Sequence, residues 1–452
     1  MTVTHTRTTS QLVAEFVAGF EFADAPPDVR EKAKVTLLHD LGVGLAGHRL
    51  AETAFALAKD VGAAPNGGGA RLPVDGTSVT VDMAALATGA MVHARTQDDT
   101  QLAISTHLGA TTLPALLALG DRSDSSGTEL LTAMVAGYEA ASAIAEAHAA
   151  DSTARGFRAS SIYGPLASAA ACARLLGLNQ EQTTSALGLA AGFGGGTNQT
   201  WVAGTQEWRY QVGMASRNGM TAALLAARGV TGAPDALEGA AGHYRSFAGT
   251  QPAEPAGADL GERWRTRDVT YKPFPVCAIN QVPVTVMVDL VTTHDVHPEQ
   301  VADVELRLAP VDAAYPGTDT HGPFTDVGGT LMSAPYCLAV AIRRRTVVLD
   351  DLYGFDDTEL MGLADRIQVI PDETLTTGSC RITVRLRDGA SVSDSFLPGP
   401  DTFNWGRDEA ADRLRQIAGE MPLSPAGLDE FIAVVLDLDN RTVRELIDKT
   451  LP

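Results

Sequence analysis

MAALATGAMV-HARTQDDTQLAISTH-LGATTLPALLALG, residues 83–120, places a polar cluster between two apolar segments of helical length. The central segment, 93–107, carries two histidines, two adjacent aspartates, an arginine and several hydroxyl side chains. Such a proton-active cluster between buried segments costs stability unless its groups are paired or perform chemistry. A solvated loop with a helix cap would also use Asp and Thr. The stretch therefore predicts either an active-site loop or a capped connection between two buried helices.

On both sides of this stretch the sequence favours helices. Residues 11–20 and 28–47 have helical spacing, with Ser10 as the expected cap of the first and the Pro26-Pro27 pair ahead of the second. From 81 to 250, segments rich in Ala, Leu and Gly follow one another, and several are apolar on all sides. Such segments predict helices buried at the centre of a large helical domain.

The sequence changes character near residue 267. Residues 301–310 alternate as a strand, and 380–397 read as a hairpin around an Asp-Gly turn. Helical segments lie between them, and the last segments are helical again. The predicted fold is mainly α: helices over residues 1–266, an α+β part over 267–407, and helices again over 408–452, where they could pack back on the first part.

The composition limits the function. The 452 residues carry a formal net charge of −21, which argues against nucleic-acid or anionic-membrane partners. The four cysteines are scattered without metal-ligand spacing, so no metal is expected. The sequence shows no apolar signal core at its start and no apolar run of membrane-spanning length, and we expect a cytoplasmic protein.

Three further stretches hold polar groups beside apolar helices. RGFRASSIYG (155–164) precedes a helix expected near Pro165, and its arginines suit either an anion or a plain surface. The glycine- and tryptophan-rich stretch 192–219 is a pocket-lining loop or a structural turn, since its GFGGG lacks a dinucleotide fingerprint. In YKPFPVCAINQ (271–281), a desolvated Lys272 would serve as a base or remain solvated, whereas Cys277 is expected to pack.

Taken together, these stretches resemble the MmgE/PrpD family, which includes 2-methylcitrate dehydratase, cis-aconitate decarboxylase and iminodisuccinate epimerase. The resemblance covers nearly the whole chain through segments in the same order and spacing. They are LLHDLGVGLAG (37–47), AALATGAMVHARTQDDT (84–100), STHLGATTLPALLAL (105–119), RGFRASSIYGPLASAAACARLLGLNQEQTTSALGLAAG (155–192), VGMASRNGMTAALLAARGVTG (212–232), YKPFP (271–275) and SAPYCLAVAI (333–342).

The resemblance implies a large all-helical domain (1–266 and 408–452) with a smaller α+β lid domain (267–407). It also implies a homodimer with a site between the domains, no metal or organic cofactor, and acid–base chemistry beside a carboxylate of a small molecule. The family's DDT is matched by Asp98, Asp99 and Thr100, its following histidine by His107, and its lysine before the FP pair by Lys272.

Other family positions differ. Thr96 stands where the family usually has Asp, and Arg158 replaces the histidine of its GFH motif. The lysine of its KRLHAG-type segment corresponds to Trp208, beside Arg209, and a polar position after the FP pair falls near Cys277. Proton carriers are lost and fixed positive charge is gained, because guanidinium binds carboxylate well but shuttles protons poorly.

We therefore predict a cofactor-independent lyase, dehydratase-like, in which His107 and Lys272 transfer protons. The predicted substrate-binding residues are Arg95, Thr96, Asp99, Thr100, Arg158 and Arg209. Three alternatives remain: an isomerase or epimerase using the same proton abstraction, a decarboxylase, and a non-catalytic ligand-binding or scaffold descendant.

Overall fold

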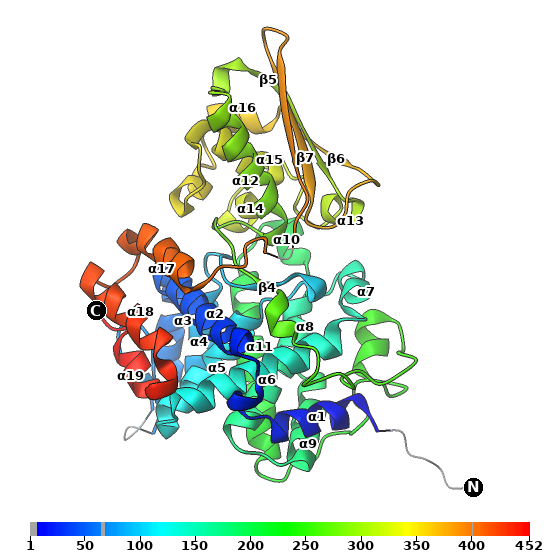
Figure 1. Ribbon diagram of the computed structural model, residues 1–452, viewed down its shortest axis with the longest axis vertical. Helices are drawn as coiled ribbons and strands as arrows, with labels where there is room; N and C mark the ends of the chain where they lie inside the picture. Colours follow the sequence, from blue (N-terminus) through cyan, green and yellow to red (C-terminus); the bar gives the residue numbers. More distant parts are fainter. Residues whose placement is uncertain (1–6, 65–67, 400) are drawn as a thin grey trace.

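The computed structural model describes residues 7–64, 68–399 and 401–452 and confirms the mainly α fold. A large helical part lies below a smaller part that holds the main sheet (Figure 1). The first eleven helices are α1 (Thr9–Gly19), α2 (Pro27–Ala46), α3 (Glu52–Val61), α4 (Val81–Val92), α5 (Leu108–Ser123), α6 (Gly127–Ala145), α7 (Ala149–Ala154), α8 (Ala159–Leu175), α9 (Gln180–Ala191), α10 (Gln199–Ala203) and α11 (Glu207–Ala226).

The C-terminal helices return to this helical part, as the sequence predicts. They are α17 (Arg407–Gln416), α18 (Pro425–Leu436) and α19 (Val443–Asp448). α17 and α18 lie beside the blue α2 in Figure 1, and α19 packs on α5. The side chain of Leu414 packs so closely on α2 that Gly42 leaves no room for a Cβ.

Two predicted helix starts are corrected. Helix α1 is capped by Thr8, not by Ser10: the Thr8 hydroxyl accepts from the Gln11 N–H, and the Gln11 side chain accepts from the Thr8 N–H. Ser10 is buried inside the first turn. Helix α8 begins at Ala159 rather than near Pro165. Pro165 is the seventh residue of α8, and the packing of α8 between its neighbours keeps the helix continuous through it.

The smaller part is α+β, as predicted. Its strands are β5 (Val301–Leu308), β6 (Ile367–Pro371), β7 (Cys380–Leu386) and β8 (Ser391–Phe396), in the order β6-β5-β7-β8. Its helices are α12 (Ala278–Thr293), α13 (Pro310–Ala313), α14 (Val327–Met332), α15 (Ala334–Arg344) and α16 (Thr358–Ala364). The predicted hairpin is present as β7–β8, while β6, parallel to β5, is a strand that the sequence analysis missed.

Two large hydrophobic cores follow this division. One joins residues from Val13 to Tyr271 with those from Trp405 to Ile447, and the other runs from Val276 to Val384. Trp201 and Trp208 of the helical part belong to the second core. We propose to divide the chain at these two crossings, close to the boundaries 266/267 and 407/408 expected from the sequence.

Two short sheets complete the helical part. β1 (Ala70–Arg71) pairs with β2 (Ser78–Val79), and β3 (Thr100–Gln101) pairs antiparallel with β4 (Val269–Thr270). The second pair ties the 93–107 stretch to the start of the connection into the smaller part. Among the helices of the described ranges, none is long and apolar enough to cross a bilayer.

Candidate active site

The predicted cluster lies on the connection between α4 and α5. Helix α4 ends at Val92, and α5 begins at Leu108, so residues 93–107 form the loop between them. Thr96 and Ser105 adopt positive φ angles of 52° and 50°, which are uncommon for residues with a Cβ. Two of the strained residues of the described structure therefore lie on the same short loop as the ionisable groups.

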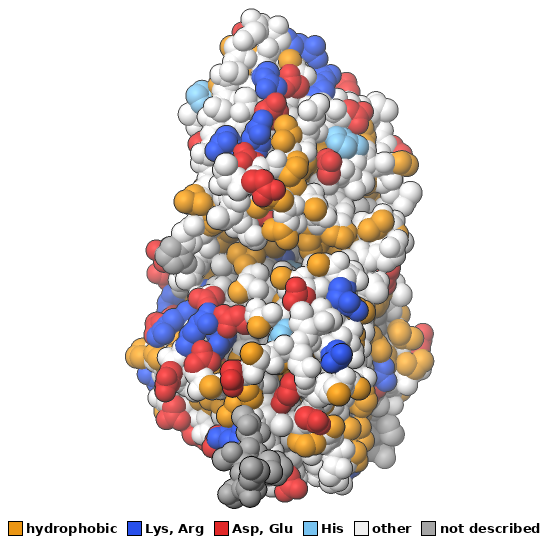
Figure 2. Space-filling view, turned by 90° about the vertical axis from the view of Figure 1, so that its right-hand side faces the viewer, with side chains coloured by type: hydrophobic (Ala, Val, Ile, Leu, Met, Phe, Trp, Pro, Cys, Tyr) orange, Lys and Arg blue, Asp and Glu red, His pale blue; other side chains and the backbone are white. Residues whose placement is uncertain are grey.

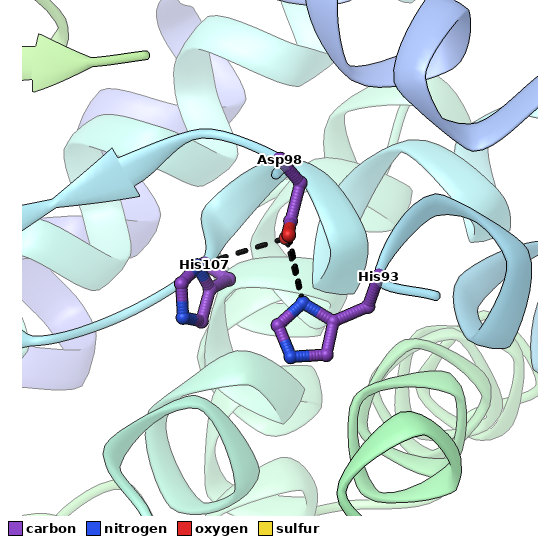
Figure 3. Close-up of side chains that lie close together, drawn as sticks. All are labelled: His93, Asp98 and His107. Carbon is purple, nitrogen blue, oxygen red and sulfur yellow. Dashed lines mark hydrogen bonds and ion pairs between the residues drawn. The ribbon is translucent and has the colours of Figure 1, made fainter. Parts of the chain in front are cut away.

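Three ionisable side chains of this loop meet at one carboxyl group. His93 Nδ1 lies 2.8 Å from Asp98 Oδ1, and His107 Nδ1 lies 3.6 Å from Asp98 Oδ2. Figure 3 shows the two imidazoles on either side of the Asp98 carboxyl. The side chains of His93 and Asp98 are completely buried, whereas that of His107 is 16% exposed. His107 is thus the member of the trio that a small molecule can reach.

The proton of His93 is placed by Arg158. Arg158 Nη2 donates to His93 Nε2 at 2.6 Å, so this nitrogen is an acceptor and the proton of the neutral ring lies on Nδ1, facing Asp98. Arg158 Nη1 is held by the Trp208 carbonyl and by Gln211 Oε1. Burial and the positive charge of Arg158 lower the pKa of His93 well below its usual range.

His107 is oriented by its backbone surroundings. Its Nδ1 donates to the Asp99 carbonyl at 2.8 Å, and its N–H donates to Ser160 Oγ at 3.1 Å. With the proton on Nδ1, Nε2 keeps its lone pair. Burial, together with the positive charge of Lys272, lowers the pKa of His107 well below its usual range. The ring is therefore neutral at physiological pH and has the form of a general base.

The spacing of His93, Asp98 and His107 is short enough to hold a metal ion. Their protonation does not fit one, because both nitrogens that face Asp98 carry hydrogen: His93 Nδ1 by the Arg158 contact and His107 Nδ1 by the Asp99 contact. A metal ligand needs those lone pairs. Lys272 and Arg158 also add positive charge beside the trio. His93 is hydrogen-bonded to Asp98, and His107 lies at ion-pair distance from the same carboxyl, so the three side chains do not fit a metal site.

Lys272 reaches the same loop from the connection between the two parts. Its Nζ donates to the carbonyl of Thr96, the residue with the positive φ angle. Lys272 is 2% exposed, and burial lowers the pKa of its amine, opposed by the charges of Asp98 and Cys277. The structure thus brings the two predicted catalytic residues, His107 and Lys272, to one loop.

The predicted binding residues divide into those near the trio and those turned away from it. Thr100 Oγ1 lies 3.5 Å from His107 Nδ1, and Arg158 contacts His93 directly. The Arg209 guanidinium stacks over the Trp208 ring at 4.4 Å. Arg95 instead forms a salt bridge with Glu420.

Two more of the predicted residues have their side chains engaged within the protein. The Thr96 hydroxyl donates to the Arg95 carbonyl at 2.7 Å. The Asp99 carboxyl is fully buried, where it accepts from the Gly109 N–H at 2.9 Å and from the Tyr138 hydroxyl at 2.8 Å.

Two glutamines fasten the chain on each side of the crossing between the parts. Gln97 Nε2 donates to the carbonyls of Lys272 and Pro273, at 3.2 and 3.1 Å. Gln281 of α12 accepts from the Phe274 N–H and donates to the Phe274 carbonyl, at 3.1 and 2.9 Å. Pro273 is therefore tied to the helical part, and the next residue is tied to the lid.

The sequence analysis missed two contributors to the site. Tyr315, in the smaller part, lies close enough for the Arg158 charge to act on its phenol, and burial raises the pKa of Tyr315 to about 12. Its hydroxyl lies 3.5 Å from Asn198 Oδ1. Trp208 contacts the His93 ring edge-on at 5.3 Å between centroids. Tyr315 carried no signal in the sequence, because the fold brings it to the site from more than 200 residues away.

The outer surface between the two parts is hydrophobic. Figure 2 shows a shallow hollow between the upper and lower parts, with hydrophobic side chains gathered along it. Val202 on α10, Val311 on α13 and Tyr353 are among the exposed large hydrophobic residues.

Comparisons with known proteins agree with the resemblance to the MmgE/PrpD family. A family profile described as MmgE/PrpD N-terminal domain matches residues 11–256. A cis-aconitate decarboxylase of Aspergillus terreus is 26% identical over 451 residues, covering 93% of this chain and 91% of the relative.

Two further relatives agree. The cis-aconitate decarboxylase-like protein oryM of Aspergillus oryzae is 27% identical, with 93% of both chains covered. The human cis-aconitate decarboxylase is 25% identical and covers 79% of this chain and 76% of its own length. Since the family profile spans more than half of the 452 residues, the chain belongs to the MmgE/PrpD family.

Proposed function

We propose that the protein is a cofactor-independent lyase that acts on a small carboxylate-bearing substrate, and that His107 begins the reaction as the base. The observation that carries this proposal is the direction of the His107 Nδ1 hydrogen bond, which is donated to the Asp99 carbonyl and leaves Nε2 unprotonated. A neutral imidazole at the partly exposed end of a buried trio suits the removal of a proton alpha to a carboxylate or carbonyl.

Lys272 is the proposed acid. Its amine is buried beside Asp98, so its proton is held close to the base without being lost to solvent. In the dehydration, His107 Nε2 takes the alpha proton and the electron pair moves onto the carboxylate as an enolate-like species. The carbon–oxygen bond then breaks, the double bond forms, and the departing hydroxide takes a proton from Lys272 to leave as water.

Fixed positive charge supports the developing negative charge. We propose Arg158 and Arg209 for this role, because both are buried near the trio. Electrostatic groups of this kind contribute about 3–4 kcal/mol each where they have been removed by mutation. Thr100 is proposed as a hydroxyl contact beside His107. Arg95 receives no role here, since Glu420 already neutralises its guanidinium.

Decarboxylation is the second candidate, favoured by the names of three relatives that cover most of this chain. In this reaction carbon dioxide leaves with cleavage of the carbon–carbon bond, and the remaining carbanion takes a proton from Lys272. The Arg158 substitution disfavours this candidate, because guanidinium is a poorer proton donor than the imidazole that the family usually has there.

One experiment separates these reactions. A thermal-shift screen of mono-, di- and tricarboxylic acids, including cis-aconitate, identifies ligands, since a ligand at 100 times its Kd adds about 2.7 kcal/mol of stability. The stabilising acids are then incubated with the protein in deuterated water and followed by NMR.

Each outcome of the NMR experiment is decisive. Loss of water supports the dehydratase, and loss of carbon dioxide supports the decarboxylase. Solvent deuterium incorporated without loss of either one overturns the lyase in favour of an isomerase or epimerase. Stabilisation by a ligand that is never converted supports the non-catalytic alternative.

We also propose a cytoplasmic homodimer, which rests on the family resemblance. Light scattering coupled to size-exclusion chromatography is expected to give twice the 47.3 kDa mass of the chain. A monomeric mass at micromolar concentration would overturn the dimer.

A further inference from the structure

Asp40 is an acidic residue inside the apolar helix α2. Its side chain has no exposure, and it is neighboured in sequence by buried leucines and glycines. An isolated ionised carboxylate in such a place is very unfavourable, so the group must be neutral or well paired. Neither the sequence analysis nor the proposed reaction gives Asp40 a role.

Asp40 meets Asp99 behind the catalytic loop. The Asp99 N–H donates to Asp40 Oδ1 at 2.7 Å. The Tyr138 hydroxyl lies 2.8 Å from Asp99 Oδ2 and 3.5 Å from Asp40 Oδ2, so it bridges the two acids. A Cβ built on Gly109 would lie 1.8 Å from Asp40 Oδ2 and 3.1 Å from Asp99 Oδ1. The two carboxyl groups thus converge on the space that glycine leaves at the start of α5.

The hydrogen bonds indicate which acid carries a proton. Both Asp99 oxygens accept short bonds, one from the Gly109 N–H and one from Tyr138. At Asp40, Oδ1 accepts the Asp99 N–H, while Oδ2 has only the long Tyr138 contact in the described structure. Two carboxylates that share a buried site do not both ionise readily. Asp40 Oδ2 is therefore the place for the proton.

Charged and titratable groups face this pair from each surrounding element. They do not make it easy for both carboxyl groups to ionise. They are Asp98 on the loop, Lys272 after β4, Lys32, His39 and Tyr271 around α2, and Tyr138 on α6. Burial and the charge of Asp98 raise the pKa of Asp99 to about 7, and burial with the charges of Asp99 and Asp98 raises the pKa of Asp40 well above its usual range. Lys272 acts in the opposite direction on both acids.

The pair reaches His107 through the backbone of one residue, Asp99. Asp40 holds the N–H of Asp99, and the carbonyl of the same residue accepts His107 Nδ1. On the other side, the Asp99 carboxyl accepts the Gly109 N–H in the first turn of α5, two residues after His107. The backbone that selects the His107 tautomer is thus fixed from behind by Asp40.

We propose that Asp40, in its protonated form, is a positioning residue for His107: it holds the backbone of Asp99, the residue whose carbonyl accepts from His107 Nδ1. This inference rests on the proposed role of His107 as the base. It predicts that Asn, which has the shape and neutrality of a protonated Asp, can perform the positioning role of Asp40. Ala cannot perform it.

The test follows His107 without any substrate. Diethyl pyrocarbonate modifies neutral imidazole, and mass spectrometry of the His107 peptide measures the rate as a function of pH. In the unmodified sequence and in Asp40→Asn, the rate is expected to stay constant between about pH 6 and 8, because His107 is already neutral. In Asp40→Ala, water enters behind the loop and the midpoint rises toward the ordinary value of about 6.5, so the rate falls as the pH approaches 6. The exposed His297 serves as the internal reference in each sample.

Two results would overturn the proposal. One is an unchanged His107 profile in Asp40→Ala, and the other is an Asp40→Asn variant that behaves like Asp40→Ala. If Asp40→Ala does not fold, the His107 profile of Asp40→Asn alone still tests the proposal. If Asp40 were ionised in the pair, Asn would disrupt the pair and change that profile. Asp289→Asn, an exposed change on α12, is the matched control. A failure to find lyase activity would contradict the proposed function but leaves this measurement unaffected.

Discussion

Asp98 and Asp99 are neighbours in sequence, yet their carboxyl groups belong to opposite environments. Asp98 faces two histidines whose pKa values are lowered by burial and by nearby cations. Asp99 faces a second buried acid and a tyrosine, and its own pKa is raised. One peptide bond therefore separates two environments. We call the cationic one around Asp98 the front and the acidic one around Asp99 the back. Identical side chains acquire different chemistry because the loop turns them toward different helices.

The largest effect is expected from breaking the front at His107. Replacing His107 with Ala removes the general base and should lower kcat by about 10²–10⁴-fold on the substrate found in the carboxylate screen. The free energy of unfolding should change little, since the ring is partly exposed. His297→Ala, an exposed histidine of the lid, is the control, and equal activity of the two variants would remove His107 from the mechanism.

Breaking the back has its main effect on stability. Gly109→Ala would place a Cβ 1.8 Å from Asp40 Oδ2, so the backbone or the acid pair must move. Overpacking of this kind typically costs about 1–3 kcal/mol or more, and we expect the upper end. Urea denaturation followed by circular dichroism measures the loss. Gly362→Ala on α16, where nothing lies within 4 Å, should be neutral, and a similar loss in both variants would contradict the crowding argument.

Asp98→Asn sharpens the contrast between the two neighbours. Asn replaces one acceptor oxygen with a donor beside His93 Nδ1, which already carries hydrogen. We expect a decrease in kcat of about 10–100-fold, within the range of a proton-transfer partner, with a small change in KM. Steady-state kinetics measure the split, and Asp295→Asn on the surface is the control. A change confined to KM would indicate that Asp98 acts on binding instead.

Two conservative arginine variants test which guanidinium belongs to the front. Lys cannot reproduce the fork by which Arg158 contacts both His93 Nε2 and the Trp208 carbonyl, so Arg158→Lys should lower activity by about 10-fold. The Arg95→Lys variant keeps its charge opposite Glu420 and should lose less. Comparison of kcat/KM between the two variants checks the order. The reverse order would return Arg95 to the substrate-binding role.

The smallest effect is a pH dependence of stability with opposite signs at front and back. His93 and His107 have lowered pKa values, so folding stability is lost as pH falls below about 6.5, where the unfolded histidines take up protons. Asp40 and Asp99 have raised values, so their contribution is lost as pH rises through the folded pKa, about 7 for Asp99. Chemical denaturation across this range measures both slopes. The two ranges overlap, so His107→Asn should remove part of the gain in stability as pH rises to about 6.5, and Asp40→Asn should remove part of the loss as pH rises above about 4.

Much of the fold could be predicted from patterns within single segments. Apolar helices around α4 and α5 and the Asp-Gly hairpin β7–β8 each carry their own signal of periodicity or turn chemistry. Strand β6 was missed, because IQVIP is short and follows a helical stretch directly, and its strand pairing with β5 depends on a segment more than 60 residues away.

The site was predictable only where its residues lie close together in sequence. The stretch 93–107 supplied His107, and the lysine before the FP pair supplied Lys272. The sequence carried no information on where Arg95 turns, since Glu420 lies over 300 residues away. Asp40 could have been identified from the sequence, because an acid in an otherwise apolar helix is rarely buried without a specific partner.

The two glutamine clamps determine where one part of the molecule ends and the other begins. Gln97 holds the chain up to Pro273, and Gln281 holds it from Phe274 onward, so at this crossing the change from one part to the other falls at a single peptide bond. Lys272 lies on the helical side of that bond, together with His107. Tyr315 lies on the other side, in the smaller part. The proposed acid and base therefore belong to one part of the molecule, and their relative position does not depend on how the smaller part is seated.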